Sequence, residues 1–238
     1  MSVTRAISKP PREDISSPGM LLACNDRSVW LATLEDYDVA IEKVSLRRGG
    51  KDLIELDRWY NHEARVVITS RQPWSMSSSD LRQIMRWKIT RGKFRPLMKL
   101  IESNSDDLVR DVSSQSFEAL RKKEYSAAIQ ILTALKGVGV ATASAILSLL
   151  EPHEFPFMSD EALLTVLPTV KKDYSLKAYN LLTSRLKSKA EALGGSLTAD
   201  DVGRAIWINA MILSESRSRS DIKDKSLELA PPTKRRRC

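Results

Sequence analysis

The chain has 238 residues and a formal net charge of +8, with 42% hydrophobic and 29% charged residues, as in ordinary globular proteins. Its two cysteines, Cys24 and Cys238, are too few for a four-cysteine zinc or iron–sulfur site and argue against a disulfide framework. No apolar run reaches the about 20 residues that cross a bilayer, so we expect no membrane segment. We also expect no metal site, because the sequence has no cluster of metal-ligating residues.

The N-terminal third predicts a polar segment followed by two helices. Residues 1–27 hold three prolines among polar residues, and we expect them to be disordered. Ser28 is the expected N-cap of a helix that ends at the RRGG stretch, 47–50. The apolar residues that define one face of this helix are Trp30, Leu34, Tyr37, Ile41 and Val44. A second helix is predicted from Leu53, Leu56, Tyr60 and Val67.

The middle of the chain predicts further helices. Ser77 and Asp80 have the spacing of a capping box for a helix that starts near Ser78. Gly92 should end this helix, and Pro96 lies early in the next one. Two more helices are expected between 105 and 135.

Helices near 140–150, 160–168, 174–191 and 198–213 complete an all-α class, because no segment alternates as a half-buried strand does. We therefore expect one folded domain over 28–215 and a disordered basic tail over 216–238. Its last basic run predicts a nuclear localisation signal and a nuclear protein, or alternatively a tail that grips DNA unspecifically. This run consists of Lys234, Arg235, Arg236 and Arg237.

Segment 71–100 carries eight basic residues against one acidic residue, which favours a surface for a polyanion over an ordinary solvated face. The basic residues that we expect to contact DNA here are Arg86, Lys88, Arg91, Lys93 and Arg95. Trp87 and Phe94 are interleaved with them and could stack on an extruded base. The favoured alternative places both aromatic rings in the core.

Two glycines precede an apolar helix in "LKGVGVATASAILSLL", residues 135–150. Each glycine inside a helix costs about 1 kcal/mol relative to alanine, so glycine here indicates a demand on the backbone. Without side chains at Gly137 and Gly139, a phosphate could reach the N–H groups at the start of the helix. Such contacts position nucleic acid without reading its sequence. The alternative is a tight helical corner in which glycine serves packing.

The stretch "LKGVGVATA" resembles the helix-hairpin-helix motif. By this resemblance the DNA contacts are Lys136, Gly137, Val138, Gly139 and Thr142. The following "EPHEFPFMSDEALL" adds a proline-containing loop and Asp160 at the start of the next helix, as in the helix-hairpin-helix DNA glycosylase superfamily. The motif covers 135–164, and the all-α plan covers about 30–212. The resemblance implies a glycosylase-like helical bundle, acting as a monomer on double-stranded DNA.

The resemblance also implies chemistry. In these enzymes the aspartate stabilises the oxocarbenium-like sugar and helps water attack, which makes Asp160 the expected catalytic residue of base excision repair. Alternatively, Asp160 only caps its helix. Bifunctional members place a lysine before the threonine of the hairpin, but this chain has Ala141, so we expect base removal without strand cleavage.

Some features of the superfamily are absent or left open. The loop before Asp160 lacks glycine, and the four-cysteine cluster of one branch is missing. No organic cofactor is expected, although carbonyl groups of such hairpins hold a monovalent cation, K⁺ or Na⁺, against a DNA phosphate in related folds. The alternative function is a catalytically silent DNA-binding module with the same fold.

Overall fold

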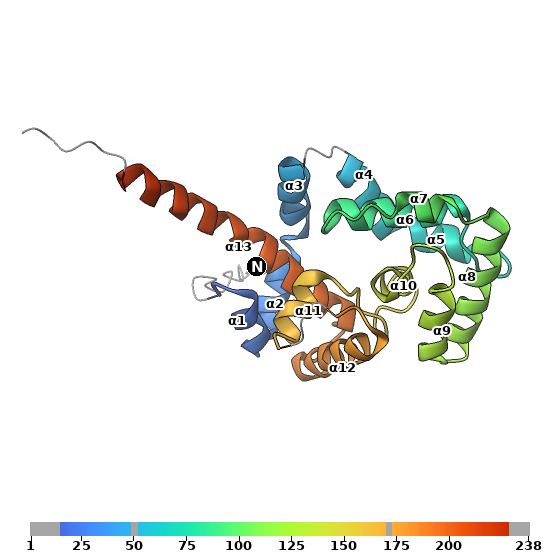
Figure 1. Ribbon diagram of the computed structural model, residues 1–238. Coiled ribbons are helices and arrows are strands. Elements are labelled where there is room, and N and C mark those ends of the chain that lie inside the picture. The colour runs from blue at the N-terminus through green and yellow to red at the C-terminus, as the bar shows by residue number, and fades with distance from the viewer. Residues whose placement is uncertain (1–14, 49–51, 170–172, 229–238) are drawn as a thin grey trace, which may run out of the picture.

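The computed structural model describes residues 15–48, 52–169 and 173–228, and within these ranges the chain forms helices and no strand (Figure 1). The helices of the first half are α1 (Pro18–Ala23), α2 (Arg27–Leu34), α3 (Tyr37–Arg48), α4 (Asp52–Arg58), the π-helix η2 (Trp59–Glu63), α5 (Ala64–Thr69), α6 (Ser78–Arg91) and α7 (Met98–Glu102). The second half contains α8 (Asp106–Arg121), α9 (Tyr125–Leu132), α10 (Val140–Leu147), α11 (Asp160–Val166), α12 (Leu176–Leu193) and α13 (Ala199–Glu228).

The helices form two groups that lie side by side (Figure 1). Helices α4 to α10 make one group, in which α6 contacts α4, α7, α8 and α10. Helices α1 to α3 and α11 to α13 make the other group, in which α13 contacts all five others. The chain therefore begins in one group, crosses to the other after α3 and returns at α11.

One cluster of buried apolar side chains runs through both groups and joins them. Its largest members include Trp30 and Trp207 from one group and Trp87 and Phe117 from the other. Helix α3 also contacts α4 and α6, and α10 contacts α12. A site between the two groups is thus held by packing from both sides.

The all-α prediction is confirmed for the described residues, and so are several of its boundaries. Helix α6 begins at Ser78 with both hydrogen bonds of the capping box between Ser77 and Asp80, and Gly92 is its C-cap. The next helix, α7, starts slightly later than predicted, with Leu97 as N-cap after Pro96. The helices expected after residue 105 are present as α8 to α13.

The predicted start of the folded domain at Ser28 is wrong. Helix α1 precedes it, and the side chain of Leu21 is fully buried. The N-cap of α2 is Asp26, whose carboxylate accepts the N–H and the hydroxyl of Ser28. The single helix predicted up to 48 is divided between α2 and α3, and this break lets α3 contact α4 and α6 while α2 packs on α13.

At the other end, α13 continues past the predicted domain boundary at residue 215 to Glu228. No glycine or proline lies between Gly203 and Pro231 to stop it. Residues 1–14 and 229–238 lie outside the described residues, so the nuclear localisation signal at 234–237 stays a prediction. Among the described residues, no helix is both long and apolar enough to span a membrane.

Candidate functional site

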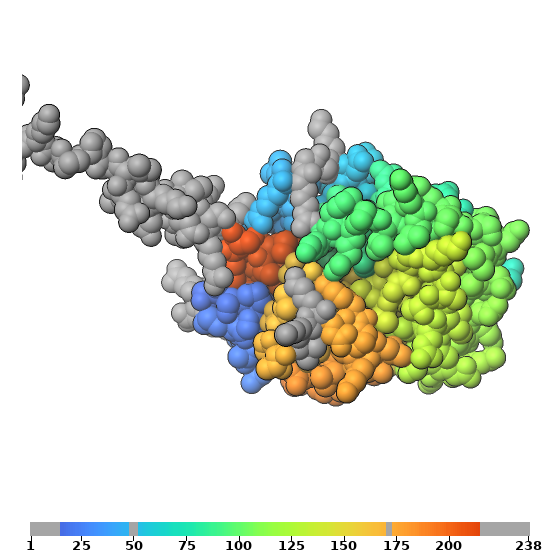
Figure 2. Space-filling view, viewed as in Figure 1, coloured from blue at the N-terminus to red at the C-terminus, as the bar shows by residue number. Residues whose placement is uncertain are grey.

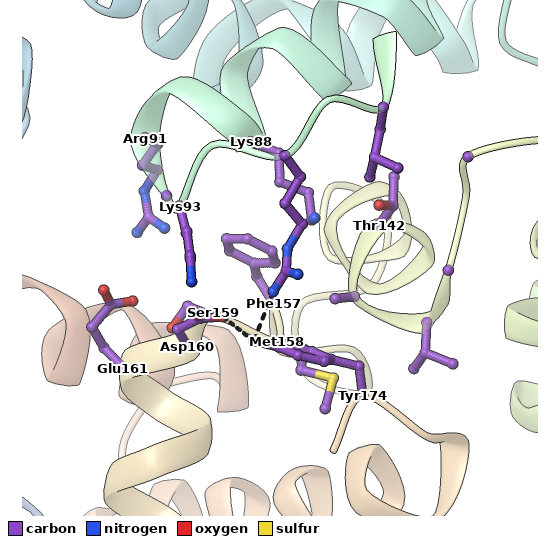
Figure 3. A pocket seen from close by; sticks show the side chains of 17 residues that line it. Lys88, Arg91, Lys93, Thr142, Phe157, Met158, Ser159, Asp160, Glu161 and Tyr174 are labelled. Carbon is purple, nitrogen blue, oxygen red and sulfur yellow. Dashed lines mark hydrogen bonds between the residues drawn. The ribbon is translucent and has the colours of Figure 1, made fainter. Parts of the chain in front are cut away.

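The segments singled out in the sequence meet around one cavity of about 230 Å³ between the two groups of helices (Figure 3). They are the end of α6 with the loop that follows it, the hairpin between α9 and α10, and the first turn of α11. On the molecular surface these parts of the chain adjoin on one face (Figure 2). The lining residues are Lys88, Arg91, Gly92, Lys93, Arg95, Leu97, Gly137, Gly139, Val140, Ala141, Thr142, Phe157, Met158, Ser159, Asp160, Glu161 and Tyr174.

The structure explains the glycine at position 137 but not the glycine at position 139. Gly137 has a φ of +80°, and a Cβ there would lie 3.1 Å from the Cβ of Leu100, so both conformation and packing favour glycine. Gly139 is the extended N-cap of α10, and a Cβ there would meet no atom within 4 Å. The packing alternative therefore accounts for Gly137 and leaves Gly139 without an internal explanation.

The backbone next to Gly139 offers hydrogen-bond donors. The carbonyl of Gly139 accepts the N–H groups of Thr142 and Ala143, at 2.8 and 2.9 Å. In the described parts of the chain, the N–H groups of Gly139, Val140 and Ala141 donate to no protein acceptor. Together with the helix dipole, they form a positively polarised end that suits an anion.

A buried asparagine, which the sequence analysis did not single out, holds the hairpin in place. Asn104 accepts the N–H of Lys136 at 2.9 Å and donates to its carbonyl at 3.0 Å, while also donating to the carbonyls at the end of α7. Within the described residues, the carbonyls of Gly137 and Val138 accept no hydrogen bond. These carbonyl groups are the candidate ligands for the expected monovalent cation, which stays a prediction.

Asp160 is not the N-cap of its helix, so the alternative that gave it only a capping role is wrong. Ser159 is the N-cap, and its hydroxyl accepts the N–H of Ala162 at 3.1 Å. The carboxylate of Asp160 instead accepts the hydroxyl of Tyr174 at 2.7 Å, and Arg95 donates to that hydroxyl oxygen at 3.0 Å. This chain of contacts links the carboxylate to two other residues that line the cavity (Figure 3).

Tyr174 remains protonated at neutral pH. Its pKa is raised to about 12. Burial is the main cause, the hydrogen bond to Asp160 also contributes, and Arg95 opposes the shift. The phenol therefore donates to the carboxylate rather than competing with it as an anion. No sequence pattern points to this residue, because Tyr174 lies in a short polar connection before α12 with no recognisable motif.

The loop before Asp160 needs no glycine, because three helices hold its backbone. Ser144 of α10 accepts the N–H of Met158 at 3.0 Å, and Asp200 of α13 accepts the N–H of Phe157 at 2.8 Å. Tyr179 of α12 donates to the carbonyl of Pro156 at 3.1 Å. The missing glycine therefore does not weaken the placement of Asp160.

The basic residues predicted from segment 71–100 differ in position. Lys88, Lys93 and Arg95 line the cavity, and Lys93 is exposed. Arg91 also lines it but is only 4% exposed, with its guanidinium carbon 3.6 Å from the ring centre of Trp207. Arg86 lies outside the cavity and forms an ion pair with Asp52 at 3.1 Å.

The predicted aromatic residues and the other predicted hairpin residues differ in burial and in their position relative to the cavity. Trp87 is buried and stacks on Tyr60 at 3.5 Å between ring centres, which confirms its expected place in the core. Phe94 is 70% exposed, so the same expectation is wrong for it, and neither ring lines the cavity. Val138 is buried in the core, and the exposed side chain of Lys136 lies beside the cavity without lining it.

The buried carboxylate of Asp57, which accepts a hydrogen bond from Trp87 of the basic segment, gives a stability prediction. Asp57 is buried and accepts hydrogen bonds from Tyr37 and Trp87, both at 2.7 Å, and from Asn61. Asp57→Ala leaves these donors unpaired and should lower the free energy of unfolding by about 3 kcal/mol. Urea denaturation would measure it, and the exposed Asp111→Ala is the control with a change below about 0.5 kcal/mol. Equal losses for both variants would contradict the role of Asp57.

Comparison with protein-family models, curated proteins and solved structures finds no match to this chain. In the described ranges, no group of three His, Cys, Asp or Glu side chains is placed to hold a metal ion. The functional reading therefore depends on the cavity and the residues that line it.

Proposed function

We propose that the protein binds double-stranded DNA and hydrolyses the N-glycosidic bond of one extruded base. The observation that carries this proposal is the convergence of three distant segments on one cavity: an open helix N-terminus, a basic edge and a held carboxylate. The resemblance of 135–164 to helix-hairpin-helix DNA glycosylases supports the same function. Base excision in the nucleus is the matching biological role.

The DNA backbone would bind at the rim of the cavity. Gly139 leaves the N–H groups of α10 open to a phosphate. Two exposed lysines are available for further phosphate contacts: Lys93, which lines the cavity, and Lys136, which precedes Gly137 in the hairpin. The carbonyls of Gly137 and Val138 would hold a monovalent cation, which supplies a further positive charge to the phosphate. None of these groups distinguishes bases, so binding should be independent of sequence.

The cavity is suited to one nucleotide. Its volume is below the about 300–1,000 Å³ of clefts that hold drug-sized ligands, so a small planar group is the appropriate occupant. The side chains of Phe157 and Tyr174 line it and offer aromatic faces to a base. A base inside a duplex reaches such a cavity only after rotation out of the stack.

Asp160 would act on the sugar. When the bond between the base and C1′ breaks, the base leaves with the bonding electrons and the sugar becomes positively charged. The nearby carboxylate stabilises that charge and accepts a proton from the water that adds to C1′. Tyr174 donates to one carboxylate oxygen and so fixes the position of the carboxylate. The products are the free base and an abasic site.

A panel of duplexes tests the proposal. Each carries a single uracil, alkylated, oxidised or mismatched base, and hot alkali reveals abasic sites after incubation with the full chain. Base release from at least one duplex, absent with Asp160→Asn, supports the proposal. Tight binding to every duplex without base release from any would instead favour the catalytically silent DNA-binding module.

The salt dependence of binding is a separate prediction. Removing Lys93 and Lys136 together, by Lys93→Ala and Lys136→Ala, should reduce the slope of log K against log salt by about 2, since each lost phosphate contact contributes about 0.9. Fluorescence anisotropy at several salt concentrations measures it. The matched control removes two charges at the end of α8, Arg121→Ala with Lys122→Ala, and should leave the slope unchanged. An unchanged slope in both would exclude this edge from the interface.

A further inference from the structure

The hairpin has no lysine at position 141, but a lysine of helix α6 lines the same cavity. Lys88 extends from α6 into the cavity that Asp160 and Tyr174 also line (Figure 3). Lys93 lines the same cavity but is exposed, and Lys136 does not line it. The expectation of base removal without strand cleavage rests on position 141, where the chain has alanine.

The amine of Lys88 is partly neutral near physiological pH. Its pKa is lowered from 10.5 to about 8. Burial is the main cause, Arg95 also contributes, and Asp160 opposes the shift. At pH 7.5 roughly a quarter of such amines are neutral, against about one in a thousand for an ordinary lysine. A neutral amine is the form that attacks a carbonyl carbon.

We infer that Lys88 is an amine nucleophile that forms an imine with the aldehyde of an abasic site and thereby cleaves the DNA strand. This inference rests on the proposed function, because the substrate of Lys88 is the product of base release. It places the nucleophile on α6, outside the hairpin, and assigns a substrate class to this lysine: an abasic sugar in duplex DNA.

The reaction balances with water alone. The neutral Lys88 amine adds to C1′ of the open-chain aldehyde, and the resulting carbinolamine takes up one proton and loses one water to give the iminium. A base removes a proton from C2′, and the electron pair of that C–H bond expels the 3′ phosphate as the C3′–O bond breaks. One water then hydrolyses the imine, which releases an unsaturated aldehyde and restores the amine. Asp160 is the carboxylate in the cavity suited to the proton transfer.

Borohydride trapping tests the inference on a duplex with a pre-formed abasic site, so base release is not needed. Borohydride reduces the imine to a stable amine, and mass spectrometry of the peptide identifies the attached lysine. The wild type should be trapped at Lys88. Lys88→Arg keeps the charge and Lys88→Met keeps the length, and each should lower trapping at least about 100-fold. DNA affinity of Lys88→Arg should stay within about threefold.

Lys189→Met is the matched control. Burial also lowers the pKa of Lys189, but this lysine lies outside the cavity and donates to Asn25 at 2.8 Å. Its replacement should leave trapping unchanged. Equal losses in the Lys88 and Lys189 variants would indicate a general effect on folding and would overturn the inference.

The pH dependence adds a second readout. Because only the neutral amine reacts, trapping at saturating DNA should rise about tenfold per pH unit below about pH 8 and then level off. The charged and titratable groups that share the cavity with Lys88 are Arg91, Lys93, Arg95, Asp160, Glu161 and Tyr174. Glu161→Gln, which removes a carboxylate from the lining without touching Lys88, should preserve the same profile.

Three further results would overturn the inference: no trapping by wild type that binds the abasic duplex, an adduct on Lys93 or Lys136, or trapping unchanged in Lys88→Arg. Each leaves the proposed function standing if alkali still reveals base release from a lesion duplex. Conversely, trapping at Lys88 without any base release would support the lyase inference and count against the glycosylase proposal.

Discussion

Asp160→Asn is expected to abolish base release while leaving DNA binding within about twofold of wild type. Asparagine has nearly the size of aspartate, and its oxygen can still accept the hydroxyl of Tyr174. It lacks the negative charge for the developing sugar cation and the basicity needed by water. The rate of base release should therefore fall by about 10²–10⁴-fold, measured in single-turnover assays on the lesion that the wild type processes.

The fold should tolerate this change, because Ser159 and not Asp160 caps α11. Glu161→Gln is the sharpest control, since it removes an equal charge from the next residue of the same cavity. Its rate should stay within about threefold of wild type. If Glu161→Gln and Asp160→Asn lower the rate equally, the effect reflects general charge in the cavity and Asp160 has no specific catalytic role.

The two hairpin glycines should respond to substitution in opposite ways. Gly139→Val should lower DNA affinity at least about 100-fold, because the added side chain occupies the approach of a phosphate to the α10 N–H groups. The free energy of unfolding should change by about 1 kcal/mol or less, since valine adopts the extended conformation of Gly139 without a clash.

Gly137→Val should instead destabilise the protein by about 2 kcal/mol or more. Its φ of +80° strains a branched side chain, and the Cβ would lie 3.1–3.2 Å from atoms of Leu100 and Ile101. Urea denaturation and anisotropy on the same samples separate the two effects. Normal DNA binding by a folded Gly139→Val protein would show that the hairpin does not approach DNA through this glycine.

Much of the fold follows from local patterns along the chain. Ser77 and Asp80 fix the start of α6, and apolar spacing gives the helices after residue 105. The hairpin and Asp160 were recognisable because their residue types follow a fixed local order. Their meeting at one cavity required the structure, since Lys88 and Asp160 are distant in sequence.

What the sequence could not show depends on partners from distant helices. Arg91 resembles its exposed basic neighbours in sequence, yet Trp207 from α13 and Phe157 cover its guanidinium. Phe94 is aromatic, as many core residues are, but it follows the end of α6, where none of the described helices covers it. Tyr174 and Asn104 act through hydrogen bonds to segments far away, which leave no periodic pattern.

Because helices from both ends of the described chain build one group, the site is completed only after α13 has been synthesised. A nascent chain that stops before α13 already contains the hairpin, the basic segment and Asp160. It lacks Asp200, which holds the backbone of Phe157, and Trp207, which covers Arg91. As domains fold during emergence from the ribosome, the loop before Asp160 gains its contacts to α13 only after this helix has left the exit tunnel. Chains that stop before α13 would thus carry the side chains of the site without all the contacts that hold them in place.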